Sequence, residues 1–195
     1  MFDNLYVALL HYPVSNRNGE TVTAAITNLD IHDISRSSRA YGVREYGIVT
    51  PIIYQHQLID RVIRHWKHGY GGEHNPVRKE ALQLVEVYET LEQFKEHIFK
   101  QHNIKPVVIG TSAKLRENSR SFKDVKEMII SRNSPIILAF GTGWGLTLEG
   151  FQAIDFVLRP IRSFATDYNH LSVRAAVAIV LDRLLGAQES DCGAA

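Results

Sequence analysis

The chain has 195 residues, of which 45% are hydrophobic and 22% are charged, and its formal net charge is +1. This composition is that of a globular protein; it excludes a disordered or fibrous chain, and the small net charge indicates no general attraction to a polyanion. The apolar runs are shorter than the roughly 18 residues of a membrane span and the first residues show no signal peptide, so we expect a cytoplasmic protein without membrane contact. The single cysteine, Cys192, excludes an internal disulfide.

Short apolar runs alternate along the chain with segments of helical periodicity. The runs predicted as strands are residues 5–11, 46–51, 82–88, 105–110, 135–141 and 154–160. The predicted helices are residues 31–41, 55–68, 90–102, 119–131 and 171–185, the third capped by Thr90 with Gln93 reaching back to it. This order predicts an α/β fold, a mostly parallel sheet covered by helices, in a single domain of residues 1–187 with a loop-rich insert near 67–80. The tail, residues 188–195, is expected to be disordered.

The segment "IILAFGTGWGLTLEG" (136–150) joins the fifth predicted strand to a short helix that is expected to begin near Thr147. Glycines after a strand let the backbone approach a ligand closely, and in open α/β sheets ligands bind at the carboxyl ends of the strands. The loop has neither the Lys and Ser/Thr pair of a P-loop nor the G-x-G-x-x-G spacing, so it indicates a nucleotide or adenosyl group without identifying it. A tight turn that merely needs glycine is the alternative.

Four stretches, in the correct order, resemble the motifs of the SPOUT family of RNA methyltransferases. They are "TNLDIHDISRSSRAYGV" (27–43), "VVIGTSAKLR" (107–116), "FGTGWGL" (140–146) and "LRPIRSFATDYNHLSVRAAVAIVLDRLLG" (158–186). The chain departs from the family pattern in three ways: Asp30 replaces the first-motif asparagine, the middle motif is shorter and lacks its glutamate, and His170 replaces the last-motif asparagine. The pattern looks most like a branch outside the well-described tRNA enzymes.

The resemblance implies a fold, a cofactor and an assembly. SPOUT proteins have a deep trefoil knot in their C-terminal half, which is exceptional among folds. They bind S-adenosylmethionine in the knot, mostly through backbone groups of three loops, and they generally work as homodimers. Carried over by motif position, the cofactor-binding residues would be Gly110, Thr111, Ser112, Phe140, Gly141, Thr142, Gly143, Trp144, Gly145, Leu146, Arg159, Pro160, Ile161, Ser163 and Leu171.

Candidate catalytic residues come from the first and last motifs. Arg36 matches the first-motif arginine, which in ribose-methylating relatives is thought to assist deprotonation of the 2′-hydroxyl; a guanidinium normally stays protonated, so phosphate binding is the alternative. Asp30 or Asp33 could accept a proton from a base nitrogen, as an aspartate is thought to do in the guanine-N1 branch of the family, or could simply cap a helix. His170 could act as a base near neutral pH, orient the acceptor, or merely pack.

The stretch "RVIRHWKHGYGGEHNPVRK" (61–79) mixes basic, histidine and aromatic side chains, which is typical of a surface that contacts RNA. Six further residues would extend this surface if the strand ends meet: Arg36, Arg39, Arg44, Lys114, Arg116 and Arg120. A metal site at the histidines is disfavoured because their spacing matches no ordinary zinc site, and a solvated helix end followed by a glycine loop is the structural alternative. The predicted RNA-binding residues are Arg39, Arg64, Lys67, Arg78, Lys114 and Arg116.

These features lead to the hypothesis of an S-adenosylmethionine-dependent methyltransferase that acts on tRNA or rRNA, with the ribose 2′-oxygen as the acceptor. Methylation of a base, of the guanine-N1 type, is the alternative within the same fold. A knotted RNA-binding protein without catalysis and a nucleotide-binding oxidoreductase of Rossmann type are the remaining hypotheses, since a fold alone does not determine a reaction.

Overall fold

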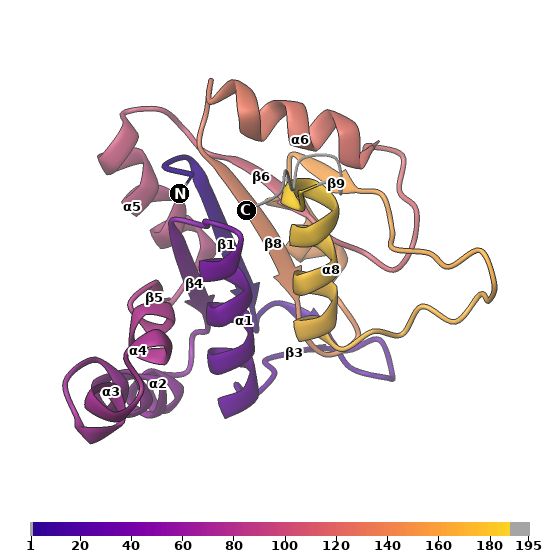
Figure 1. Ribbon diagram of the computed structural model, residues 1–195. Helices are drawn as coiled ribbons and strands as arrows, with labels where there is room; N and C mark the ends of the chain where they lie inside the picture. Colours follow the sequence, from indigo (N-terminus) through magenta and orange to yellow (C-terminus); the bar gives the residue numbers. More distant parts are fainter. Residues whose placement is uncertain (1, 188–195) are drawn as a thin grey trace.

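The computed structural model of the chain, shown in Figure 1, describes residues 2–187. The tail predicted to be disordered, residues 188–195, lies outside the described residues. Within them, seven strands form one sheet, and every neighbouring pair of these strands is parallel. The predicted α/β fold with a mostly parallel sheet is therefore confirmed.

The strands of the sheet are β1 (Leu5–Leu10), β4 (Glu45–Val49), β5 (Val85–Tyr88), β6 (Val107–Gly110), β7 (Ser119–Arg120), β8 (Ile136–Gly141) and β9 (Phe156–Leu158). Their order across the sheet is β5-β4-β1-β8-β6-β9-β7. The central strands β1, β4 and β8 are buried along almost their whole length, as continuously apolar strands covered on both faces should be. A separate antiparallel hairpin of β2 (Val14–Ser15) and β3 (Thr21–Val22) follows β1, where the sequence predicts no strand.

Helices cover both faces of the sheet. They are α1 (Asn28–Ala40), α2 (Ile53–Lys67), α3 (Tyr70–His74), α4 (Pro76–Leu82), α5 (Leu91–His102), α6 (Phe122–Ser131), α7 (Leu148–Gln152) and α8 (Val173–Leu185). One face packs against α1, α2, α4, α6 and α8, and the other against α5 and α7. Side chains of a strand alternate between the two faces, so β1 contributes to both cores. No helix among the described residues is long and apolar enough to cross a bilayer.

The structure corrects several predicted boundaries. Residues 67–80 are not mainly loop: they form the end of α2, all of α3 and most of α4, because Asn75 caps α4 and Pro76 starts it. The strand predicted from residue 82 begins only at Val85, and the helix predicted from residue 119 begins after its cap, Ser121. The short helix expected after Thr147 is present as α7, capped by that threonine.

The predicted cap of α5 is confirmed in one half only. The Thr90 hydroxyl accepts a hydrogen bond from the Gln93 N–H at 3.2 Å. The Gln93 side chain, however, accepts from the Glu89 N–H at 3.0 Å and not from Thr90. A glutamine is long enough to reach one residue further back than the reciprocal capping pattern requires.

Candidate functional site

Three loops meet where neighbouring strands of the sheet end. β8, β6 and β9 are adjacent and parallel, so the loops that follow them start at the same edge. These loops are residues 111–118, 142–147 and 159–172. The Asn169 side chain in the third loop donates to the Ala113 carbonyl oxygen in the first at 2.8 Å. The rings of Trp144 and His170, from the second and third loops, have centroids 6.2 Å apart, so all three loops are in contact.

The glycine loop after β8 pairs with the β2–β3 hairpin. The Trp144 N–H donates to the Ser15 carbonyl oxygen at 3.0 Å, and the Ser15 N–H donates to the Gly145 carbonyl oxygen at 2.9 Å. Gly143 has a φ of +59°, and a Cβ on it would lie 2.9 Å from the Ser15 oxygen, so this glycine is needed for contact with the hairpin. Gly145 has a φ of +95°, and no described atom lies within 4 Å of its Cβ position. Gly143 is therefore needed for the contact with the hairpin, whereas Gly145 has open space beside it.

The free donors of this loop fit a ligand that is recognised through the backbone. The N–H groups of Thr142, Trp144 and Gly145 donate to carbonyl oxygens of the protein. In the part of the chain that the structure describes, those of Gly143 and Leu146 have no backbone acceptor. The third loop, which meets the glycine loop through Trp144 and His170, carries the exposed apolar side chains of Phe164 and Leu171. Free N–H groups next to apolar side chains suit an adenosyl group, so the residues present fit S-adenosylmethionine.

Several predicted cofactor residues have side chains that already form contacts within the protein. Phe140 is 1% exposed in the core, and Ile161 packs against the core. Gly110 is packed so closely that a Cβ on it would lie 2.9 Å from the Ile154 side chain. The hydroxyl groups of four others form hydrogen bonds within the protein: those of Thr111, Ser112, Thr142 and Ser163. The Trp144 side chain, unlike that of Phe140, is largely exposed, at 66%.

Asp30 is buried and already has partners. It is the third residue of α1, and its carboxylate accepts from the Thr27 N–H at 3.1 Å and the Thr27 hydroxyl at 2.6 Å in a capping box. Arg174 of α8 donates to its other oxygen at 3.2 Å and lies 3.4 Å from the Asp33 carboxylate. The Asp30 side chain is 6% exposed and that of Asp33 is 47% exposed. The capping alternative is therefore confirmed for Asp30, and Asp33 is the accessible carboxylate.

Arg36 and His170 lie apart from Asp30. Arg36 is exposed on α1, and the six positions that separate it from Asp30 turn its side chain about 120° away. No carboxylate among residues 2–187 forms an ion pair with Arg36. His170 is exposed beside Trp144 in the third loop. The structure thus leaves Arg36 and His170 open to solvent, at positions separate from the buried Asp30.

Sequence reasoning does not single out His11, a buried polar residue at the same edge of the sheet. His11 follows β1 and is 0% exposed, and its Nδ1 lies 3.5 Å from Oγ1 of Thr142 in the glycine loop. Its Nε2 has no hydrogen-bond partner in the described structure. Burial lowers the pKa of His11 to about 4, although the negative charge of Asp30 opposes the shift. The only signal in the sequence is a polar residue at the end of the apolar run "LYVALLH".

Four of the predicted RNA-binding residues lie on α1 and on the insert formed by α2, α3 and α4. Arg39 is paired with a glutamate of α4, and Lys67 lies 3.5 Å from a glutamate of β5. The Arg78 guanidinium lies 4.9 Å from the centre of the Trp66 ring. Arg64 is exposed and bonds only weakly to its own helix, at 3.4 Å. Much of the positive charge predicted here is therefore neutralised or stacked within the protein.

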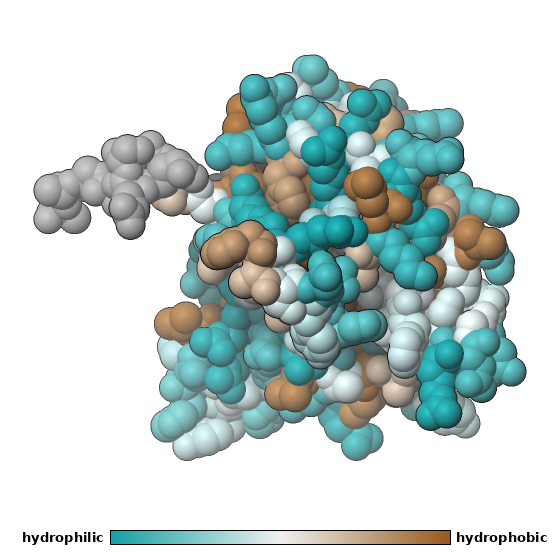
Figure 2. All heavy atoms as spheres, turned by 90° about the vertical axis from the view of Figure 1, so that its right-hand side faces the viewer, coloured by the Kyte–Doolittle hydropathy of each residue, from teal (hydrophilic) through white to brown (hydrophobic). Residues whose placement is uncertain are grey.

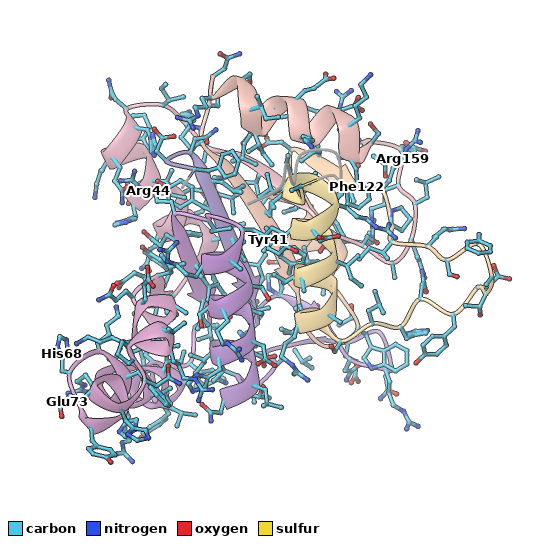
Figure 3. The ribbon with its side chains drawn as sticks, in the orientation of Figure 1. Tyr41, Arg44, His68, Glu73, Phe122 and Arg159 are labelled. Carbon is cyan, nitrogen blue, oxygen red and sulfur yellow. The ribbon has the colours of Figure 1, made fainter. Side chains whose placement is uncertain are left out.

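The other two predicted RNA-binding residues lie in the first loop. Lys114 is exposed, whereas the Arg116 guanidinium lies 3.6 Å from the centre of the Phe151 ring. Arg44 does not extend either group: it precedes β4, at the opposite edge of the sheet, where it donates to a carbonyl oxygen of the N-terminal segment. Figure 3 shows Arg44 far from His68 and Glu73, which mark the insert. The expectation of one continuous basic surface that includes Arg44 is therefore wrong.

The parallel sheet with its loops at one edge is an arrangement that this chain shares with several solved methyltransferase structures. The SpoU methyltransferase AviRb of Streptomyces viridochromogenes, solved with AdoMet, matches with a TM-score of 0.56 and 14% identity, over 95% of this chain and 60% of that one. TrmJ of Z. mobilis matches with a TM-score of 0.59 and 13% identity, over 94% and 69%. The TrmH/SpoU tRNA modifying enzyme of A. aeolicus matches with a TM-score of 0.53 and 12% identity, over 96% and 83%. At such identities these likenesses establish the fold.

The family follows from the sequence. A family model described as SAM-dependent RNA methyltransferase matches residues 4–186, so the chain belongs to this family, and the resemblance to SPOUT proteins is confirmed. A protein named tRNA (guanine-N(1)-)-methyltransferase from Oleidesulfovibrio alaskensis is 45% identical over 94% of this chain, and one of the same name from Nitratidesulfovibrio vulgaris is 44% identical over 94%. The chain spans only 42% of each. A protein of Aquifex aeolicus is 39% identical, over 97% of this chain and 92% of its own length.

Proposed function

We propose that the chain transfers a methyl group from S-adenosylmethionine to RNA. The observation that carries the proposal is the meeting of three loops at the ends of β8, β6 and β9, where the N–H groups of Gly143 and Leu146 have no backbone acceptor among the described residues. S-adenosylmethionine, when bound, supplies a methyl group on a positively charged sulfur. The residues of the chain hold the cofactor by its polar edges, align the acceptor atom with the methyl group and take up the proton that the acceptor loses.

For the acceptor, we favour a ring nitrogen of guanine in tRNA over the ribose 2′-oxygen that the sequence analysis favours. The support is the name of two relatives that are 45% and 44% identical to this chain. Those proteins are more than twice as long as the matched part, so their named reaction comes to this chain only as a proposal. Transfer to N1 of guanine forms a carbon–nitrogen bond, breaks the carbon–sulfur bond and releases the N1 proton, which a carboxylate can accept.

Asp33 is the carboxylate that we assign to this proton. Its side chain is far more exposed than that of Asp30, which is held by the capping box and by Arg174. Arg174 also lies 3.4 Å from Asp33 and fixes its position near the end of the third loop. Arg36, exposed and without a carboxylate partner among the described residues, then serves as an anchor for a phosphate of the RNA. A carboxylate can accept the N1 proton of guanine, whereas a guanidinium, which stays protonated, cannot.

We further propose the knot and the homodimer that the family resemblance implies. The order of strands supports the knot, because β9 lies between β6 and β7, which the first loop connects directly. The chain that leaves β9 has to pass this connection before it forms α8, which packs against α1 and α6 (Figure 1). For the homodimer, the support is that part of α8, residues 173–176 and 178–179, is only half-buried and could contact a second copy of the chain.

The test is methyl transfer followed by identification of the product. Purified protein is incubated with S-adenosylmethionine labelled in the methyl group and with tRNA from cells that lack the gene, and the nucleosides are separated by mass spectrometry. We expect label in N1-methylguanosine. Label in 2′-O-methylated nucleosides would overturn the acceptor but keep the enzyme class. Calorimetric binding of NAD without binding of S-adenosylmethionine would overturn the class itself.

A further inference from the structure

Three aromatic rings are gathered at the rim of the candidate site, outside the core. Trp144 from the second loop is 66% exposed and Tyr168 from the third is 70% exposed. The ring of His170 lies between them: its centroid is 6.2 Å from Trp144, at an interplanar angle of 70°, and 5.7 Å from Tyr168, at 56°. Because the rings contact one another edge to face or tilted, they do not stack on each other, and their flat faces remain available to a ligand.

The backbone holds this aromatic cluster in place although its side chains are exposed. The Trp144 N–H is bonded to the hairpin at 3.0 Å. The Asn169 side chain, between the other two aromatic residues, is bonded to the first loop at 2.8 Å. The Tyr168 N–H is bonded to the Thr166 hydroxyl at 3.2 Å. Rings fixed at their backbone lose little freedom when a ligand stacks on them, which favours binding.

The charge around the cluster is positive. The third loop, residues 159–172, contains two arginines, at positions 159 and 162, and one acidic residue, Asp167; Arg174, just after it, is already paired with Asp30 and Asp33. Lys114 follows the carbonyl group to which Asn169 is bonded, so it also lies close to the cluster. Figure 2, which faces the third loop, shows hydrophobic side chains as separate spots between hydrophilic ones. A partner of negative charge with flat apolar faces suits this surface better than an apolar protein surface does.

We propose that Trp144, Tyr168 and His170 form a stacking surface for unpaired nucleobases of the RNA substrate, next to the nucleotide that is methylated. The inference rests on the proposed function, because it places the RNA across the loops that hold the methyl donor. Unpaired bases are the usual targets of aromatic side chains in RNA recognition, and stacking tolerates any base because each base has a flat face. The surface therefore adds affinity for single-stranded RNA, whereas the target base is selected by the residues around the nucleotide that is methylated.

Tryptophan fluorescence tests the proposal directly, since the chain has only two tryptophans. Trp66, on α2, is half-buried, and its ring lies against His32 of α1 and Arg78 of α4. Short oligoadenylate is titrated into wild type, Trp66→Phe and Trp144→Phe, and an abasic ribose-phosphate strand of equal length is the charge control. We expect oligoadenylate to quench wild type and Trp66→Phe but not Trp144→Phe, and the abasic strand to quench none of them.

Affinity measurements separate stacking from a structural role. Trp144→Ala and Tyr168→Ala are expected to weaken oligoadenylate binding on the order of tenfold each, whereas Tyr168→Phe keeps the ring and the affinity. Tyr54→Ala, which removes an 82% exposed tyrosine from α2, is the matched control and should leave the affinity unchanged. Equal affinity of the alanine variants and wild type, equal quenching by the abasic strand, or protection of Trp144 by self-association would each overturn the stacking surface.

Calorimetry with S-adenosylmethionine on the same variants keeps the two proposals distinguishable. Wild type, Tyr168→Ala, Tyr168→Phe and Tyr54→Ala are expected to bind the cofactor equally, because neither tyrosine is among the residues assigned to the cofactor. Normal cofactor binding with base-independent RNA binding would refute the stacking surface alone. Stacking of oligoadenylate by a protein that binds no S-adenosylmethionine would refute the proposed methyltransferase and remove the reason to place a methylated nucleotide beside the rings.

Discussion

Arg174 of α8 and Asp30 of α1 form an ion pair, with Nη1 of the arginine 3.2 Å from Oδ1 of the aspartate. The two residues are 144 positions apart in the chain, and they belong to the helices that carry the last and the first motif. The aspartate is buried and the arginine is about one third exposed, so the pair is partly shielded from water. Loss of one partner would leave the other charge unpaired in a partly buried place, so a single replacement should cost more than it would in a pair on the surface.

Replacing Arg174 by leucine should lower the free energy of unfolding by about 2 kcal/mol. Removal of one partner from a buried pair typically costs about 3–5 kcal/mol, and we expect less here because Asp30 keeps two donors from Thr27. Urea denaturation measures the change. Arg183→Leu, on the same helix, is the control and should cost less than about 1 kcal/mol, because Arg183 only lies over the ring of Phe122. Equal losses in the two variants would refute a special role for the pair.

Asparagine substitutions separate the two carboxylates of α1. Asp33→Asn should reduce the rate of methyl transfer by about a hundredfold or more, which is the usual contribution of a general base, and should leave stability almost unchanged. Asp30→Asn should instead lower the free energy of unfolding by about 1–2 kcal/mol, because its ion pair with Arg174 is lost. The measurements are single-turnover methyl transfer and urea denaturation of both variants. Full activity of Asp33→Asn would show that another group accepts the proton.

The sequence predicts the sheet well because its strands carry strong local signals. β1, β4 and β8 are continuous apolar runs that only a doubly covered strand can bury. The hairpin of β2 and β3 has no such signal: its strands are two residues long, and pairing with the glycine loop holds it in place. Contacts between segments that are distant in the chain leave no periodic pattern, so this element could not be predicted.

The candidate site is predictable as a set of loops but not as an arrangement of side chains. The glycines, the late position of their loop and the flanking motifs identify the three segments that the structure joins. The burial of Asp30 depends on Arg174, and the histidine beneath Thr142 depends on strand order; neither relationship has a signature in the local sequence. The position of Arg44 differs from these two, because a residue that precedes a strand of a parallel sheet lies at the edge opposite the loops, which the sequence itself indicates.

His11 should make the stability of the protein depend on pH between about 4 and 6.5. Its folded pKa is lowered to about 4, whereas the unfolded chain binds the proton near 6.5, so in this window the unfolded state holds more protons and stability rises with pH. The full effect amounts to about 3 kcal/mol, present above pH 6.5 and lost as the pH falls toward 4. Urea denaturation at several pH values measures it.

Two variants assign this pH dependence. His11→Gln removes the titrating group and should flatten most of the profile, whatever its effect on stability at neutral pH. A smaller slope of the same sign should remain, since burial and the nearby Arg78 also lower the pKa of His32. His68→Gln removes an exposed histidine and should leave the profile of wild type intact. A profile of His11→Gln that still matches wild type would mean that the buried imidazole does not control acid stability.

Two alanine substitutions in the glycine loop test why its glycines are needed. Gly143→Ala places a Cβ 2.9 Å from the Ser15 carbonyl oxygen at a φ of +59°, so it should separate the loop from the hairpin and cost about 2–4 kcal/mol. Gly145→Ala meets no described atom within 4 Å and should cost only the strain of its φ of +95°, about 1–2 kcal/mol. Urea denaturation gives both values, and hydrogen exchange at the Ser15 N–H should quicken in Gly143→Ala alone. If Gly145→Ala also loses S-adenosylmethionine binding by calorimetry while Ser15 stays protected, the open side of this glycine is where the cofactor approaches the backbone.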